Sequence, residues 1–513
     1  MPPVAGRPRR ARLAPAIALV AAGLTVALAA CDSSTRLPVA TQEVAGVTDL
    51  AATPAAARTT APTRAPSVTA QPGPVETPGP SAPAPAPGDP TAPGATGIVP
   101  GTVDRTSLDL TASYDVKAAI TVSTGALDVT TAISVRNDSG AGIDRLELNT
   151  IAARLGGMKI LATTVDDVPV KATFRDQTVT VPLGGVLPDG ASTTVRIEYR
   201  ATLAKGTTGS DWMFSRSGGV LTLYRWIPWV SVATPFDRPN AGQPFVTPTS
   251  PEVDVELLTD APLVLAAPSA KYDEFAAGSG NYWAFSAKDV RDVAIVLAPE
   301  FRVATGKADG VPVRAFSRPG GPSATALLDL AIGAVRSEAD QLGMAFPASS
   351  MTVIDTPAGV GLESPGMVWV PRKLDTRNRT YAIYQGVAHQ WFYGLVGNDQ
   401  RAEPFADEGP SDLLARSVLH TLRASRCGQV ALDRAVTKYA GSCYYEQVIV
   451  QGGRVLDSLR QRMGTTAFWT AMRAYLNEYR GEIAGTKELL ETLRAGTKAN
   501  LLPVLRSRFP SLY

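Results

Sequence analysis

The chain has 513 residues, a hydrophobic content of 45% and a formal net charge of +2. Its length allows about two or three domains, and the hydrophobic content is ample for buried cores. The nearly balanced charge excludes a strongly basic surface for nucleic acid, so no nucleic-acid partner is expected.

The first 30 residues have the layout of a secretory signal peptide. An apolar run from Leu13 to Ala30 follows four arginines, Arg7, Arg9, Arg10 and Arg12. The run ends in L-A-A-C, which is similar to a bacterial lipobox, where the cysteine carries lipid. We predict a lipoprotein signal peptide over 1–30, lipidation of Cys31 and anchoring on the outer face of a bacterial cell membrane. The alternatives are an ordinary signal peptide with an incidental cysteine and an uncleaved membrane anchor.

The segment 31–105 has the composition of a tether. It holds 14 of the 41 prolines, and Ala, Thr, Ser and Gly fill most of the remainder. Such a segment cannot bury enough apolar surface to offset the entropy lost on ordering. We therefore predict an extended, disordered tether that lifts the following domains off the membrane.

From about residue 106 the sequence changes to short runs in which apolar and polar residues alternate. Examples are L-D-L-T-A-S-Y-D-V-K at 108–117 and T-V-T-V-P-L at 178–183, separated by turn clusters such as L-P-D-G at 187–190. A period of two is typical of half-buried strands. We predict a β domain over 106–308.

Near residue 320 the apolar spacing changes to that of helices. The stretch 324–342 has apolar residues at helical spacing, and M-T-V-I-D-T at 351–356 predicts one short strand. We predict a second, mostly helical domain over 309–513, with further helices at 377–396, 409–424, 428–440, 446–463, 465–478 and 486–496.

Two cysteines remain besides Cys31. Cys427 and Cys443 are 16 residues apart at a predicted connection between helices. In an oxidising compartment outside the cytoplasm this spacing favours a disulfide. The alternative is a pair of small buried apolar side chains.

Several motifs of the second half resemble one enzyme family. A-H-Q-W-F is followed by D-E-G, with Glu408 nineteen residues after His389. Three further segments match the same family: R-W-I-P-W-V-S at 225–231, G-L-E-S-P-G-M-V-W at 361–369 and L-R-Q-R-M-G at 459–464. Together they are similar to the membrane alanine aminopeptidases, which are zinc metallopeptidases of the gluzincin group. The resemblance covers 106–513.

This resemblance implies a multidomain α+β fold. An N-terminal antiparallel β-saddle domain would precede a thermolysin-like, mostly helical metallopeptidase domain. His389 and Glu408 match zinc ligands of the family. Glu363 matches the glutamate that binds the free amino group of the substrate, and Glu403 takes the place of an acid that supports the zinc site.

Three positions depart from the family pattern. Gln385 replaces the first histidine ligand, and an amide oxygen is a weak ligand for zinc. Gly386 replaces the catalytic glutamate, and loss of a general base typically costs about 10²- to 10⁴-fold in rate. Ile449 replaces the tyrosine that donates to the oxyanion, a further loss of about 10²- to 10³-fold. Tyr444 and Tyr445 lie about one turn earlier.

Each retained residue also has a purely structural interpretation. His389, on a helix with Trp391 and Phe392, could be a core histidine. Glu408 could be an acidic residue favoured at a helix N-terminus, and Glu363 could be a surface strand residue. One histidine and one glutamate alone would hold zinc only weakly.

We predict a cell-envelope lipoprotein with a degenerate aminopeptidase-like site, a pseudo-peptidase that binds peptides or an envelope protein. The alternative is an active metallopeptidase with a non-standard zinc site formed by Gln385, His389 and Glu408, in which Glu363 or Glu403 is the base. A third interpretation is a structural envelope protein whose cleft is filled by side chains.

Overall fold

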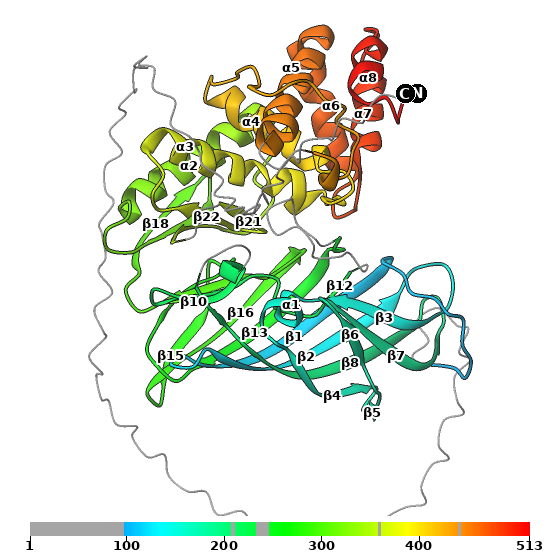
Figure 1. Ribbon diagram of the computed structural model, residues 1–513, viewed down its shortest axis with the longest axis vertical. Helices are drawn as coiled ribbons and strands as arrows, with labels where there is room; N and C mark the ends of the chain where they lie inside the picture. The colour runs from blue at the N-terminus through cyan, green and yellow to red at the C-terminus, as the bar shows by residue number, and fades with distance from the viewer. Residues whose placement is uncertain (1–96, 207–210, 232–245, 358–360, 440–442) are drawn as a thin grey trace, which may run out of the picture. The chain divides into compact units, whose positions relative to one another are not determined.

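The computed structural model describes residues 97–206, 211–231, 246–357, 361–439 and 443–513 (Figure 1). The predicted signal peptide, Cys31 and residues 31–96 of the predicted tether lie outside the described residues. Residues 97–105 do not continue the tether. Val99 pairs with Val186, and the carboxylate of Asp144 accepts the backbone N–H groups of residues 103–105. Within the described part of the chain, no helix is long and apolar enough to cross a membrane.

The first half of the described chain is built from three sheets. The largest has eight strands in the order β15-β16-β13-β1-β2-β8-β4-β5. Their bounds are Asp273–Ala277, Gly280–Val290, Ser250–Thr259, Leu110–Thr121, Ala126–Asn137, Ser192–Thr202, Lys159–Val165 and Val168–Pro169. Buried and exposed residues alternate along β1, as the period of two predicted. The sheet is mixed, because β1 and β13 run parallel.

Two smaller sheets accompany it. One has the order β14-β17-β11-β10-β9, with bounds Val264–Ala266, Ile295–Ala298, Val220–Leu223, Phe214–Ser217 and Ala204–Lys205. The other has the order β12-β3-β7-β6, with bounds Trp229–Val230, Ile143–Asn149, Thr178–Leu187 and Thr173–Arg175. The short helix α1 (Ile151–Leu155) begins at Thr150, whose side chain accepts the N–H of Ala152.

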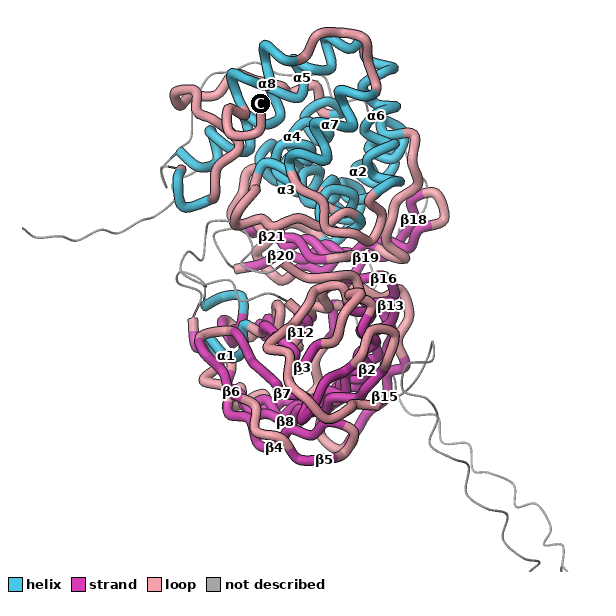
Figure 2. Tube along the Cα trace, turned by 90° about the vertical axis from the view of Figure 1, so that its right-hand side faces the viewer, coloured by secondary structure: helices cyan, strands magenta, loops and turns pink. Residues whose placement is uncertain are grey.

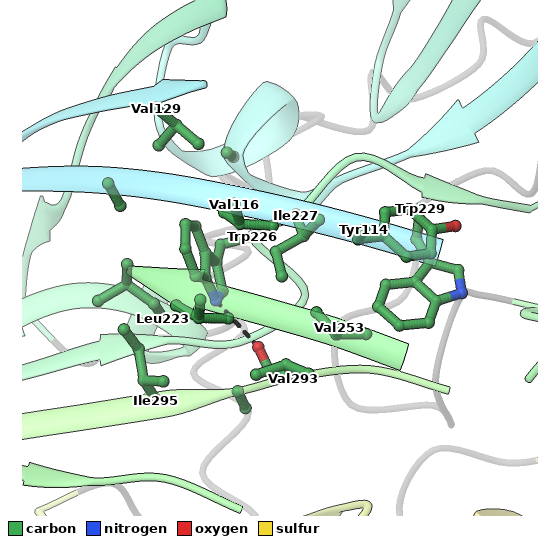
Figure 3. Close-up of a cluster of buried hydrophobic side chains, with 14 of the residues drawn as sticks. Tyr114, Val116, Val129, Leu223, Trp226, Ile227, Trp229, Val253, Val293 and Ile295 are labelled. Atoms are coloured by element: carbon green, nitrogen blue, oxygen red, sulfur yellow. Dashed lines mark hydrogen bonds between the residues drawn. The ribbon is translucent and has the colours of Figure 1, made fainter. Parts of the chain in front are cut away.

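The segment around Trp226 forms part of the core of these sheets (Figure 3). Trp226 is fully buried, and its indole N–H donates to the carbonyl of Val293 at 2.9 Å. Trp229 stacks on Tyr114 with 4.2 Å between ring centroids. Burial of two tryptophans with paired polar atoms fixes this segment against β1.

A fourth sheet belongs to the second half of the chain. Its order is β18-β19-β20-β22-β21, with bounds Arg302–Ala308, Val311–Ser317, Met351–Thr356, Met367–Pro371 and Leu362–Ser364. The strands β19, β20 and β22 are parallel, and β21 is an antiparallel edge strand. Because β18 pairs with β19, this sheet begins at Arg302, inside the range predicted for the first domain.

Helices make up most of the remaining chain (Figure 2, cyan). They are α2 (Ala324–Leu342), α3 (Thr376–Ala388), the π-helix η2 (Gln390–Leu395), α4 (Phe405–Val418), the 3₁₀ turn η3 (Val436–Lys438), the π-helix η5 (Tyr445–Val450), α5 (Gln451–Met463), α6 (Thr465–Glu478), α7 (Thr486–Ala495) and α8 (Leu502–Arg508). The predicted helices at 446–463, 465–478 and 486–496 agree with this within a few residues, if η5 and α5 are taken together.

The helix predicted at 428–440 is wrong, because only η3 is helical among its described residues. Tertiary contacts override the local helical pattern there. Gln451 binds the backbone of Cys427, Gly428 and Val430. The disulfide between Cys427 and Cys443 is confirmed, with 6.2 Å between the two Cα atoms. It joins this irregular segment to Cys443, two residues before η5 begins.

Candidate functional site

Three side chains from α3 and α4 meet at one point. Gln385 and His389 are four residues apart, so they share one face of α3, and Glu408 lies in the first turn of α4. The amide nitrogen of Gln385 is 3.0 Å from Nε2 of His389 and 3.1 Å from Oε2 of Glu408. The third edge, from His389 Nε2 to Glu408 Oε2, is 3.5 Å. Gln385, His389 and Glu408 are called the triad below.

The Gln385 amide can donate one N–H to each partner. In that arrangement His389 Nε2 is an acceptor, and the imidazole proton lies on Nδ1. The Asp407 carboxylate faces Nδ1 at 3.9 Å, and Nδ1 has no hydrogen-bond partner among the described residues. Asp407 is itself held by the side-chain amides of Asn398 and Gln400.

The charges around the triad are mostly negative. Burial lowers the pKa of His389, but the carboxylates of Glu363, Glu408 and Asp407 outweigh burial and raise this pKa to about 10. Burial raises the pKa of Asp407 to about 7, and Glu408 adds to this rise while His389 opposes it. An imidazolium would donate from Nε2, and Gln385 would then present its amide oxygen. That oxygen would face the Glu408 carboxylate, which also only accepts, so the Gln385 amide hydrogen-bonds both neighbours only while His389 is neutral.

The triad matches zinc in size but not in its donor atoms. Tetrahedral zinc with bonds of about 2.0–2.1 Å separates its ligands by about 3.3 Å, and the triad edges of 3.0–3.5 Å are comparable. The donors do not fit, because the third position offers a neutral amide where zinc sites use imidazole, thiolate or carboxylate. Among the described residues, no group of three or more His, Cys, Asp or Glu side chains could hold a metal ion.

Glu363 reaches the same site from the edge strand β21. It pairs with Val368 on β22, and its charge raises the pKa of His389. The turn of this hairpin is tied to the residue after His389. Gln390 accepts the N–H of Gly366 at 2.7 Å and donates to the carbonyl of Ser364 at 3.3 Å. The predicted amine-binding residue therefore lies beside the triad.

Gly386 packs tightly on the sheet. A β-carbon at this position would lie 2.7 Å from both γ-carbons of Val368. Such a contact is too short for any side chain, so α3 lies closer to β22 than a glutamate at this position would allow.

The region of the missing tyrosine is reshaped by the π-helix η5. Ile449 is buried inside it, with 8% exposure. Burial raises the pKa of Tyr444 well above its usual value, and the charges of Glu408 and Asp407 raise it further, so the Tyr444 phenol is near the acidic pair. Its hydroxyl has no hydrogen-bond partner within the described ranges. The apolar pattern predicted an α-helix over 446–463 and did not indicate the π-helix η5 at its start.

Glu403 takes a different position from the one the resemblance implies. Its Oε2 accepts the N–H of Thr486 at 2.6 Å, at the start of α7. The carboxylate facing Nδ1 of His389 is that of Asp407. Sequence analysis missed this role of Asp407, and its only signal was the position directly before Glu408.

Comparison with known proteins identifies the fold. No protein-family model and no curated protein matches the chain. Among solved structures, the M1 zinc metallopeptidase from Deinococcus radiodurans has a TM-score of 0.63 at 19% identity, over 78% of this chain and 93% of that chain. A mutant of that enzyme bound to a Tyr-Ser-Ala substrate has a TM-score of 0.61 at 18% identity, over 78% and 93%. A two-domain M1 zinc metallopeptidase mutant bound to L-tryptophan gives 0.61 at 18% identity, over 78% and 94%. The chain therefore has a multidomain α+β fold similar to that of M1 zinc metallopeptidases.

Proposed function

We propose that this chain is a pseudo-peptidase, which binds peptides or an envelope protein at an aminopeptidase-like site without hydrolysing them. In this proposal a β-saddle domain precedes a thermolysin-like, mostly helical domain. The observation that carries the proposal is the amide of Gln385, which hydrogen-bonds both His389 and Glu408. The Gln385 amide pairs with both partners without a metal, although Nδ1 of His389 has no hydrogen-bond partner among the described residues.

The residues of the site have chemistry suited to binding. The carboxylate of Glu363 on β21 would hold the terminal ammonium group of a peptide. Catalytic groups are missing beside it, since Gly386 has no proton acceptor and Ile449 has no hydroxyl. Hydrolysis needs a positioned base and a donor to the developing oxyanion. A bound peptide would therefore remain intact.

We also propose a location for this activity. The signal peptide over 1–30, the lipobox that ends in Cys31 and the proline-rich segment after it support a lipoprotein on the outer face of a bacterial membrane. A peptide or protein of the envelope would be its partner there.

A second candidate function is an active metallopeptidase with a non-standard zinc site. The triad edges of 3.0–3.5 Å favour it, because they suit a metal in size. Gln385 would have to present its amide oxygen, and Glu363 or Glu403 would have to act as the base. Glu403 would first have to release the N–H of Thr486.

Two measurements separate these functions. Purified protein is dialysed against zinc and then against buffer, and bound zinc is measured by elemental analysis. Binding and cleavage of tripeptides are measured by calorimetry and mass spectrometry, with and without EDTA. The pseudo-peptidase should bind a tripeptide with a free amine equally well in EDTA and leave it intact, and Glu363→Gln should weaken this binding. Stoichiometric zinc together with cleavage that is lost in His389→Ala would overturn the proposal.

A further inference from the structure

Arg225 is buried in an unusual conformation. Its side chain is 2% exposed, and its backbone φ of +48° lies in the left-handed region, which is strained for an arginine. The guanidinium donates hydrogen bonds to side-chain hydroxyls of the described residues. It donates to the hydroxyl of Thr247 at 3.1 Å, to that of Tyr224 at 3.4 Å and to that of Tyr393. A strained backbone and a buried charge are retained only where surrounding contacts fix them.

One of these contacts leads to the triad. Tyr393 lies four residues after His389, in η2, where the backbone leaves helical geometry at Phe392 (φ −101°, ψ 55°) and Tyr393 (φ 163°, ψ −56°). The ring of Tyr393 also packs 5.7 Å from the guanidinium carbon of Arg225. Arg225 thus holds the irregular turn that ends the histidine-bearing segment.

A second contact leads to Glu363. The Nε of Arg225 is 3.9 Å from the buried carboxylate of Asp292. The same carboxylate oxygen accepts the hydroxyl of Ser364 at 3.1 Å. Ser364 is fully buried and directly follows Glu363 on β21. The Arg225 guanidinium therefore contacts Tyr393 in the His389 segment and, through Asp292, is linked to Ser364 beside Glu363.

We infer that Arg225 is a positioning residue, which fixes the Glu363 strand relative to the His389 segment. If the Glu363 strand or the His389 segment moved, the buried Arg225–Asp292–Tyr393 contacts would be broken. An unpaired charge in such a buried region is costly. Arg225 and Asp292 both come from the part of the chain before Arg302, which forms the three N-terminal sheets, whereas the residues of the site all lie after it. The three-sheet part therefore sets the geometry of the site. The inference rests on the proposed function only in its use of a peptide ligand.

Arg291 provides a matched control. It is also a buried arginine, but the hydrogen bonds that it makes with the described part of the chain go to backbone carbonyls, those of Thr247 at 2.8 Å, Leu395 at 3.3 Å and Glu482 at 2.6 Å. Arg291→Met should destabilise the protein, as Arg225→Met should. It removes a contact to Leu395, which also belongs to η2, but it leaves the hydrogen bond from Arg225 to Tyr393 and the hydrogen bond from Ser364 to Asp292 in place.

The first test compares binding of one tripeptide with a free amine and with an acetylated amine. Wild-type protein should prefer the free amine by about tenfold or more, since Glu363 is held in place. Arg225→Met should reduce this preference to less than about threefold, and Arg291→Met should keep it. Arg225→Lys, which keeps the charge and loses the forked geometry, should fall between them. An unchanged preference in Arg225→Met would overturn the inference.

The second test needs no ligand. Hydrogen exchange is followed in residues 362–371 at denaturant concentrations that equalise the global stability of the variants. Arg225→Met should speed exchange in this hairpin by about tenfold relative to Arg291→Met. Should wild-type protein show no preference for a free amine, the proposed function fails, and exchange alone decides the inference. Equal exchange in the two variants would then overturn it.

Discussion

Gly386 and Val368 are in closer contact than any other residue at position 386 would permit. A β-carbon there would lie 2.7 Å from each γ-carbon of Val368. Valine is stiff about χ1, so it cannot easily turn away. Gly386, which the resemblance aligns with the base of the aminopeptidase family, is a packing contact between α3 and β22, so any side chain at this position meets a steric barrier.

Gly386→Ala should therefore lower the free energy of unfolding. Overpacking costs about 1–3 kcal/mol, and the gain in helix propensity offsets up to about 1 kcal/mol of it. In the Gly386→Ala, Val368→Ala double variant, the loss of stability should be smaller than the sum of the losses in the two single variants. Denaturant unfolding of wild type, both single variants and the double variant measures this difference. Gly428→Ala is the control, because nothing lies within 4 Å of a β-carbon there. A Gly386→Ala protein more stable than wild type would show that α3 can move away from β22.

Gln385→His should create a zinc site. It would supply two imidazoles four residues apart together with Glu408, the donor set that zinc prefers. We expect zinc affinity to rise by at least about 100-fold, or about 2.7 kcal/mol, in calorimetric titrations. His389→Ala added to this variant should abolish the gain. No peptide cleavage is expected, because Gly386 and Ile449 are unchanged. Failure to bind zinc would mean that α3 and α4 do not bring these positions together.

Glu338 should make stability depend on pH. This residue of α2 is fully buried, and burial raises the pKa of its carboxyl well above the usual value. Neither oxygen has a hydrogen-bond partner among the described residues. The unfolded pKa is about 4.3, so stability should fall as pH rises from about 4 towards the folded pKa, by about 1.4 kcal/mol per pH unit.

Glu338→Gln should remove most of this dependence and be more stable than wild type at pH 7. Unfolding by urea at pH 5 and pH 7 measures both effects. Glu300→Gln, at an exposed position, is the control and should leave the dependence intact. Equal slopes with pH for wild type and Glu338→Gln would contradict the assignment.

Reduction of the disulfide should destabilise the second half of the chain. Closing a loop of this length stabilises by about 3 kcal/mol in the chain-entropy model. The Cys427→Ser, Cys443→Ser double variant should melt at a lower temperature than oxidised wild type and be insensitive to dithiothreitol. The segment should keep part of its structure, because Arg423 pairs with Glu446 at 2.6 Å. If oxidised and reduced wild type melt at the same temperature, the cross-link does not restrict the unfolded chain.

Local patterns in the sequence determined much of the fold. Alternation along β1 and helical spacing in α2 reflect the side-chain periods of strand and helix, which are properties of a few neighbouring residues. That Gln385, His389 and Glu408 meet was implied by the resemblance to the aminopeptidase family, and local spacing alone placed only Gln385 and His389 on one helix face. The pairing of Cys427 with Cys443 was readable because the described residues offer no other cysteine.

Only the tertiary structure decided what the site contains. Three of its contacts depend on packing between distant segments, which no local period encodes. They are Gly386 with Val368, Glu403 with the start of α7, and Asp407 with His389. The link from Arg225 to Tyr393 spans 168 residues of sequence. The same holds for 428–440, where contacts with Gln451 overrode a helical pattern. Propensity acts over a few residues, whereas burial and hydrogen bonding are settled by whichever distant segments pack together.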